Sequence, residues 1–173
     1  DPIATACEST KATPVLITVL RNHQGAMTKR LSLSADGALL KTPACALYDG
    51  EAERVAVNGL DELASLIAKL KPNEALCYGV STYERVQVVT QEALSQHPGA
   101  IARDREHFTY PSGPGLMMLD YDPTGDPLSP KDVIQKLKRA MPEIANVAMM
   151  WRPSASSCVF NKATGDEVRG VCG

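Results

Sequence analysis

The chain has 173 residues, of which 44% are hydrophobic and 22% are charged, a composition that argues against a disordered chain. Its 18 basic and 20 acidic side chains give a formal net charge of −2, so charge alone does not predict binding to nucleic acid. Any nucleic-acid surface on this protein would have to be local.

Neither the apolar runs nor the cysteines predict a membrane-spanning segment or a metal-binding site. The longest apolar stretch near the start of the chain, residues 14–20, is far shorter than the ~20 residues of a membrane-spanning helix. The five cysteines are scattered and never form a CxxC pair, which suggests neither a zinc site nor a full disulfide framework. We therefore expect no membrane partner, and free thiols in a reducing cytoplasm.

The first half of the chain predicts strands, a hairpin and a helix. Aliphatic, β-branched or alternating runs predict strands at 14–20, 28–34, 38–42, 53–57 and 75–80. The pair Asp36–Gly37, between the second and third of these runs, is typical of a β-hairpin turn. Residues 60–70 predict a helix, because their large apolar residues fall on one face, their acids come first and their lysine last. A further helix is expected within residues 82–96.

The second half predicts one strand, one helix and two more strands. The apolar run at 116–122 predicts a strand that ends at Pro123. Ser129 is expected to cap a helix that continues to residue 140, because Pro130 suits the first helical position. Two further strands are expected at 147–151 and 156–160, with a turn at 164–166. The order strand, helix, strand, strand is half of a ferredoxin-like unit.

These elements predict an α/β (α+β) fold that forms one integrated domain. We divide it into an N-terminal lobe at 1–98 and a second lobe at 99–173. The strand at 116–122 carries apolar residues on both faces, so we expect it inside a sheet. The strand at 147–151 should belong to the same sheet, with the helix at 129–140 packed across it.

The sharpest candidate for chemistry is the acidic pair Asp120 and Asp122 at the end of the expected strand. Alternate residues of a strand project to the same face, and two carboxylates held close together repel each other unless a cation neutralises them. Mg²⁺ or Mn²⁺ would do so and would support two-metal phosphoryl chemistry. The alternative is that the pair forms a turn before Pro123, since aspartate is a good turn former.

A second candidate is the hydroxyl-rich segment after Trp151. Its Arg152, Ser154 and Ser156 suit contacts to phosphate or sugar oxygens, although serines in a polar connection also bond to their own backbone. Arg103 and Arg105, which precede the acidic strand, are further candidates for nucleotide contacts. Four cations on the expected helix form either a solvated face or a template-binding surface: Lys131, Lys136, Lys138 and Arg139.

Three segments in a fixed order carry a resemblance to a known family. They are ARDREHFTY at 102–110, GPGLMMLDYDP at 113–123 and WRPSASS at 151–157. Together they resemble the primase-polymerase proteins of bacterial mobile elements and prophages, which belong to the archaeo-eukaryotic primase superfamily. The resemblance covers most of the chain and is most specific between Arg103 and Ser157.

This resemblance implies a two-lobed catalytic core, with an N-terminal α/β lobe and a partial lobe like an RNA-recognition motif. It implies a DNA primase or polymerase in which Asp120 and Asp122 bind two Mg²⁺ or Mn²⁺ ions. Such an enzyme adds NTPs or dNTPs on a single-stranded DNA template during replication of a phage or mobile element. A replicative helicase, as a further domain or a separate protein, would be its partner.

The sequence departs from the family pattern at its end. The family has a later histidine that contacts the incoming nucleotide and a later strand aspartate that completes the metal site, and here no histidine follows His107. The resemblance therefore implies an N-terminal fragment or a degenerate member of the family, which we expect to extend primers poorly or not at all. Two alternatives stay open: another metal-dependent phosphoryl enzyme such as a nuclease, and a non-catalytic module that binds nucleotides or nucleic acid.

Overall fold

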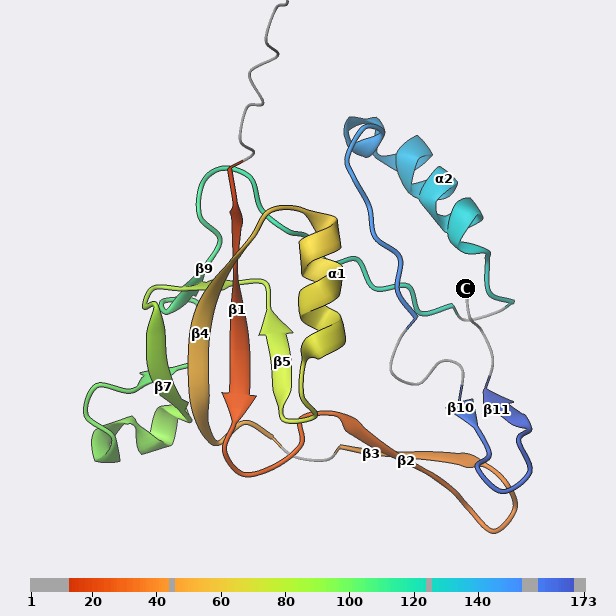
Figure 1. Ribbon diagram of the computed structural model, residues 1–173, viewed down its shortest axis with the longest axis horizontal. Helices are drawn as coiled ribbons and strands as arrows, with labels where there is room; N and C mark the ends of the chain where they lie inside the picture. The colour runs from red at the N-terminus through yellow and green to blue at the C-terminus, as the bar shows by residue number, and fades with distance from the viewer. Residues whose placement is uncertain (1–12, 44–45, 124–125, 154–158, 170–173) are drawn as a thin grey trace, which may run out of the picture.

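Five strands form the central sheet of the computed structural model, which describes residues 13–43, 46–123, 126–153 and 159–169 (Figure 1). In spatial order they are β5 (Glu74–Cys77), β1 (Val15–Asn22), β4 (Asp49–Val57), β7 (Arg85–Val89) and β8 (Ile101–Ala102). All neighbouring pairs run antiparallel except β7 and β8, which run parallel. The sheet is therefore mixed, and the chain combines it with few helices.

Three two-stranded sheets and four helical segments complete the described residues. The small sheets pair β2 (Lys29–Leu33) with β3 (Leu39–Pro43), β6 (Val80–Ser81) with β9 (Phe108–Thr109), and β10 (Val159–Phe160) with β11 (Glu167–Arg169). The α-helices are α1 (Leu60–Lys69) and α2 (Pro130–Ala140), and the 3₁₀ segments are η1 (Gln91–Gln96) and η2 (Pro142–Ile144). No helix in the described ranges is long and apolar enough to cross a membrane.

The core lies on both faces of the central sheet, because side chains alternate along its strands. On one face Ile17 and Val57 pack with Leu63 of α1. On the other face a second cluster joins residues from the sheet and from β9: Leu20, Ala52, Val88, Ile101 and Phe108. α1 begins where Glu62 accepts hydrogen bonds from the backbone and side-chain nitrogens of Asn58, at 2.7 and 2.9 Å, which supports the start of the helix.

Thr18 links the middle of β1 to β6. Its buried Oγ1 donates to the carbonyl oxygen of Gly79 at 2.9 Å and accepts from the backbone nitrogen of Ser81 at 2.8 Å. The sequence pattern marks Thr18 only as one more β-branched strand residue. In the structure it satisfies two polar backbone groups that would otherwise lie buried without a partner.

Thr18→Val is therefore expected to lower the free energy of unfolding by about 2 kcal/mol, since valine keeps the shape but leaves both backbone groups unpaired. Urea denaturation followed by circular dichroism measures the change. Thr109→Val, at an exposed position of β9, is the matched control and should be close to neutral. Equal stability of the two variants would show that the Thr18 bridge contributes nothing.

Most of the predicted elements are confirmed. The β2–β3 hairpin turns at Ser34–Ala38, where the two backbones are hydrogen-bonded and Gly37 has a φ of 82°. α1 occupies 60–69, and α2 begins after Ser129, whose side chain accepts from the backbone nitrogen of Asp132. The fold therefore combines helices with a mixed sheet, consistent with the α+β class.

The helix expected within residues 82–96 is confirmed only in part. Residues 85–89 form β7, and only 91–96 are helical, as the 3₁₀ segment η1. The reason lies in the alternation of this stretch. Val86 and Val88 face the second core cluster while Arg85 and Gln87 face away, and β4 offers a free edge with which they pair.

The strands expected at 116–122 and 147–151 are wrong. Residues 115–123 and 148–153 have no regular secondary structure, and neither segment joins a sheet. Met117, Met118 and Leu119 are 68%, 63% and 50% exposed, so the apolar pattern does not mark a buried strand here. A strand needs a partner edge as well as an apolar pattern, and the described part of the second half supplies none beside these segments. Of the expected strand at 156–160, only Val159–Phe160 lies within the described residues, as β10.

Candidate functional site

The acidic pair lies in an extended connection between β9 and α2. Asp120 and Asp122 are exposed, and within the described residues neither carboxylate makes an ion pair or a hydrogen bond. The connection is fixed at one end by Leu116, which packs against the core cluster of Ile17, Val57 and Leu63. Both carboxylates therefore face water and are available to a cation.

An aromatic contact joins the acidic segment to the second candidate segment. The ring centroids of Tyr121 and Trp151 are 6.2 Å apart and the ring planes are inclined by 52°, a geometry within the favourable range for aromatic pairs. The hydroxyl of Tyr121 also accepts a hydrogen bond from the backbone nitrogen of Leu128 at 2.9 Å. Tyr121 lies between the two aspartates and Trp151 precedes Arg152, so the structure brings the two predicted motifs side by side.

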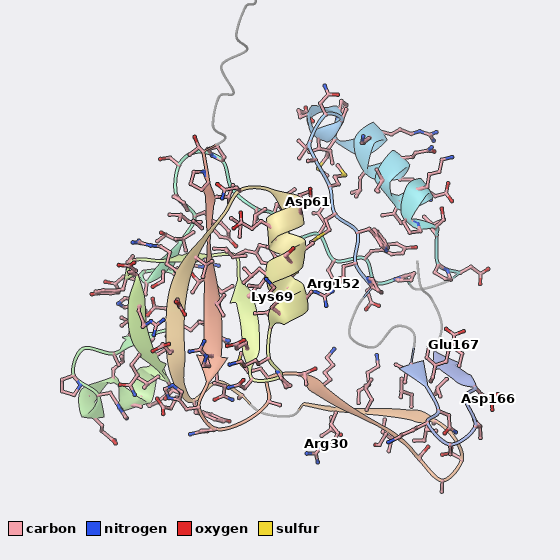
Figure 2. All side chains as sticks on the ribbon, viewed as in Figure 1. Arg30, Asp61, Lys69, Arg152, Asp166 and Glu167 are labelled. Carbon is pink, nitrogen blue, oxygen red and sulfur yellow. The ribbon has the colours of Figure 1, made fainter. Side chains whose placement is uncertain are left out.

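Arg152 lies at an open pocket on the edge of the sheet. The pocket is a hollow with a volume of about 460 Å³ that opens widely to solvent. Figure 2 shows Arg152 beside the C-terminal end of α1, near Lys69. The pocket has an apolar wall and a polar rim, lined by Met27, Thr28, Ile67, Leu70, Lys71, Pro72, Glu74, Ala75 and Arg152. A ligand with an apolar ring and an anionic group would fit this distribution.

Glu74 is the one acid of the pocket, and its charge is partly balanced by Arg21, which also pairs with Glu51. Its Oε2 accepts from the backbone nitrogen of Lys71 at 2.9 Å, and its Oε1 accepts from Nε of Arg21 at 2.9 Å. The hydrogen bond from the Lys71 backbone, together with the bond and charge of Arg21, lowers the pKa of the Glu74 carboxyl below its ordinary value. The remaining charges of the rim, Lys71 and Arg152, are both positive and favour an anion.

Arg103 and Arg105 lie elsewhere. Both are exposed on the turn between β8 and β9, which Asp104 stabilises by accepting hydrogen bonds from the backbone nitrogens of Glu106 and His107 at 3.0 Å. β8 and β5 are opposite edges of the five-stranded sheet, and four strand spacings correspond to about 19 Å. The structure therefore does not bring these arginines to the pocket of Arg152.

The two serines of the second motif, Ser154 and Ser156, lie outside the described residues, so their expected contacts are not placed. The sequence did not predict that Lys71 and Thr28 would line the pocket. These residues come from two separate connections, and no spacing in the sequence links them to each other or to Arg152. Only the tertiary fold reveals the pocket.

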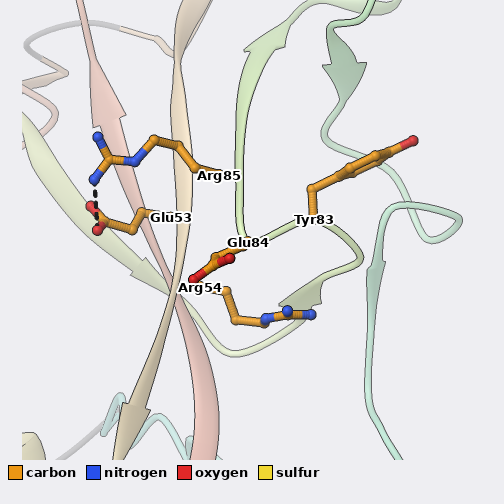
Figure 3. Close-up of a pocket in the computed structure, with 5 residues that line it drawn as sticks. All are labelled: Glu53, Arg54, Tyr83, Glu84 and Arg85. Atoms are coloured by element: carbon orange, nitrogen blue, oxygen red, sulfur yellow. Dashed lines mark hydrogen bonds and ion pairs between the residues drawn. The ribbon is translucent and has the colours of Figure 1, made fainter.

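A second pocket opens where β7 begins beside β4 (Figure 3). It is lined by Glu53, Arg54, Tyr83, Glu84 and Arg85. Nη2 of Arg85 lies 2.8 Å from Oε1 of Glu53, and the hydrogen bond from Glu53, together with nearby carboxylates, raises the pKa of the Arg85 guanidinium. Arg85 and Glu53 thus pair with each other, and the two basic and two acidic side chains of the lining leave this pocket with no net charge.

The donor chemistry of the acidic pair suits Mg²⁺ or Mn²⁺. These ions prefer oxygen ligands, and Mg²⁺ is commonly held by one or two carboxylates together with water and substrate phosphates. Among the residues the structure describes, no group of three or more His, Cys, Asp or Glu side chains converges to hold a metal. Asp120 and Asp122 would therefore bind such an ion weakly until a phosphate ligand joined them.

Comparisons with known proteins add no relative. No family model matches the chain, and no curated protein or solved structure is significantly similar to it.

Proposed function

We propose that this chain is the nucleotide-binding core of a primase-polymerase-type nucleotidyltransferase, built as an N-terminal α/β lobe and a partial lobe like an RNA-recognition motif. The observation that carries the proposal is the contact of Tyr121 with Trp151. It brings the segment that carries a carboxylate pair suited to divalent cations beside the segment that carries an arginine suited to phosphate. In a nucleotidyltransferase these two kinds of group must act on the same triphosphate.

In this proposal the pocket of Arg152 receives the incoming NTP or dNTP. The apolar wall from the end of α1 would contact the base or sugar, and Lys71 and Arg152 would hold phosphate oxygens by charge-assisted hydrogen bonds. Asp120 and Asp122 would hold Mg²⁺ or Mn²⁺, which when bound supplies charge neutralisation at the phosphates. A primer 3′-oxygen would then bond to the α-phosphorus as the bond to pyrophosphate breaks, with the template a single strand of DNA.

One observation favours a second candidate, a non-catalytic module that binds nucleotides. The described residues contain no third carboxylate or histidine beside the acidic pair, so a ligand set for two ions is incomplete. Such a module would keep the pocket and its positive rim but would not form phosphodiester bonds.

Incorporation of labelled nucleotide into primed and unprimed single-stranded DNA, with Mg²⁺ or Mn²⁺, separates these functions. We expect the 173-residue chain to bind NTP but to incorporate it poorly. A version extended by a segment with the family's histidine and aspartate should incorporate nucleotide readily. Nucleotide binding with no incorporation by either version would favour the non-catalytic module. Cleavage of the DNA strand would instead identify a nuclease.

A further inference from the structure

Helix α2 presents a basic face that the proposed nucleotide site does not use. Three of its cations are exposed and Lys138 is half-buried, and the full set is Lys131, Lys136, Lys138 and Arg139. Asp132 is the only acid of the helix, which leaves a local charge of +3. In Figure 2, nitrogen-tipped side chains project from α2 on the side away from the central sheet.

None of these four cations takes part in an ion pair within the described ranges. The ion pairs formed there use Arg21, His23, Arg85 and His107, all of which belong to the central sheet or its loops. The only acid of α2 is engaged at its own helix start, where Oγ of Ser129 donates to Asp132 at 2.7 Å. Asp132 lies within the same arc of the helix, so the basic face keeps a net charge of +3, and none of its cations is ion-paired in the described structure.

The cations gather on one side of α2 because of the helical period. At about 100° per residue, they fall within an arc of roughly 160°, and Val133, Ile134 and Leu137 fall on the opposite arc. Val133 is buried and the other two apolar residues are half-buried, so this opposite side is the one that packs. From Lys131 to Arg139 the basic face extends about 12 Å along the helix axis.

The start of α2 is joined to the acidic segment. The backbone nitrogen of Leu128 donates to the hydroxyl of Tyr121, and Ser129 directly after it caps the helix. A polyanion lying along α2 would therefore lead toward the segment that holds Asp120 and Asp122. A template strand needs such a path, because it must reach the site where the incoming nucleotide is held.

We propose that the basic face of α2 binds the phosphate backbone of single-stranded nucleic acid and guides the template to the acidic segment; the template role rests on the function proposed above. A membrane surface fits less well, because a membrane-bound helix must insert its apolar side, and that side of α2 packs against the protein. An acidic protein partner also fits less well, since this face carries no aromatic residue and only one arginine, the residue types that anchor protein interfaces.

The test is binding of a fluorescently labelled single-stranded DNA, measured by anisotropy over a range of salt concentrations, with EDTA present so that no metal contributes. Lys136→Gln, Lys138→Gln and Arg139→Gln are combined in one variant, since glutamine resembles both residues in helix propensity. We expect affinity to fall at least about tenfold, and the slope of log K against log salt to decrease by about 2, as the loss of three phosphate contacts predicts. A variant with Lys136→Arg and Lys138→Arg keeps the charges and should bind like the parent chain.

The location control removes three exposed cations elsewhere, through Lys29→Gln, Arg30→Gln and Lys162→Gln. Equal weakening by the two triple variants, or an unchanged salt slope in the α2 variant, would overturn the proposal. So would binding of the parent chain to anionic lipid vesicles but not to DNA. DNA binding that depends on α2, with no metal or nucleotide effect at Asp120 and Asp122, would keep the α2 surface and reject the nucleotidyltransferase. Normal DNA binding by the α2 variant, alongside metal-dependent incorporation, would reject the α2 surface and keep the nucleotidyltransferase.

Discussion

Replacing Asp120 and Asp122 together by asparagine is expected to abolish Mn²⁺ binding at the acidic segment. Asparagine keeps the size of each side chain but removes both negative charges, and hard divalent cations bind carboxylates far better than amides. Both positions are exposed and unpaired in the described structure, so the fold should be unaffected. Mn²⁺ bound at this segment broadens nearby NMR resonances, so the effect is measured directly as the broadening of the backbone amide resonances of Tyr121 and of residue 122.

The same double substitution should reduce nucleotide incorporation by the extended version at least about a hundredfold, because transfer depends on ions that neutralise and orient the triphosphate. Asp126→Asn is the matched control: it removes one exposed carboxylate from the same connection and should change neither binding nor incorporation. If the double variant broadens and incorporates as the parent does, the metal site lies elsewhere. Other acids of the second half would then be tested, namely Glu143, Asp166 and Glu167. Figure 2 places Asp166 and Glu167 at the start of β11, apart from Arg152.

The elements that could be predicted are those stabilised by interactions between residues close together in the sequence. α2 follows from Ser129, Pro130 and an apolar stripe, because the cap and the helical period act within a few residues. The β2–β3 hairpin follows from Asp36–Gly37, where glycine takes a φ of 82° at little cost. β1 is predictable because its aliphatic run is buried on both faces.

The elements that were not predictable depend on partners distant in the sequence. β7 lies in the stretch 82–96, within which only a helix was expected, and its strand conformation depends on the edge of β4, more than 30 residues earlier. The segment at 116–122 has the apolar pattern of a buried strand but no partner edge in the described structure, and so it remains extended and exposed. Local pattern specifies which residues prefer burial, and it does not specify whether a second strand is available to pair.

The candidate site shows the same division. The acidic pair and Arg152 were singled out by their chemistry, and the structure brings their segments together through Tyr121 and Trp151. That contact spans 30 residues, and nothing in the spacing of the two motifs requires it. The role of Lys71 at the pocket could not be predicted for the same reason, since it lies in a connection between α1 and β5 that carries no motif.

Gly50→Ala is expected to lower the free energy of unfolding more than any other substitution that adds a single methyl group to the sheet. Gly50 is buried at the start of β4, where it pairs with Asn22 of β1. A Cβ on Gly50 would collide with the backbone carbonyl oxygen of Arg21 and would lie 2.5 Å from Cδ1 of Leu47. The Leu47 side chain could rotate away, but the Arg21 carbonyl belongs to the backbone of β1 and could move only by disturbing the β1–β4 pairing.

Because the obstacle is backbone, the cost should exceed the ~1–3 kcal/mol typical of an overpacked core, and the melting temperature should fall by about 10 °C. Gly115→Ala is the matched control. A Cβ there meets no atom within 4 Å, and its backbone φ does not lie in the left-handed region, so its stability should stay within about 0.5 kcal/mol of the parent. Thermal and urea unfolding of both variants measure the difference. If Gly50→Ala is as stable as Gly115→Ala, then the carbonyl of Arg21 in β1 does not approach Gly50 of β4 as closely as the structure places it. In that case the register of β1 against β4, which orients Arg21 toward Glu74 at the edge of the candidate pocket, would have to be reassigned.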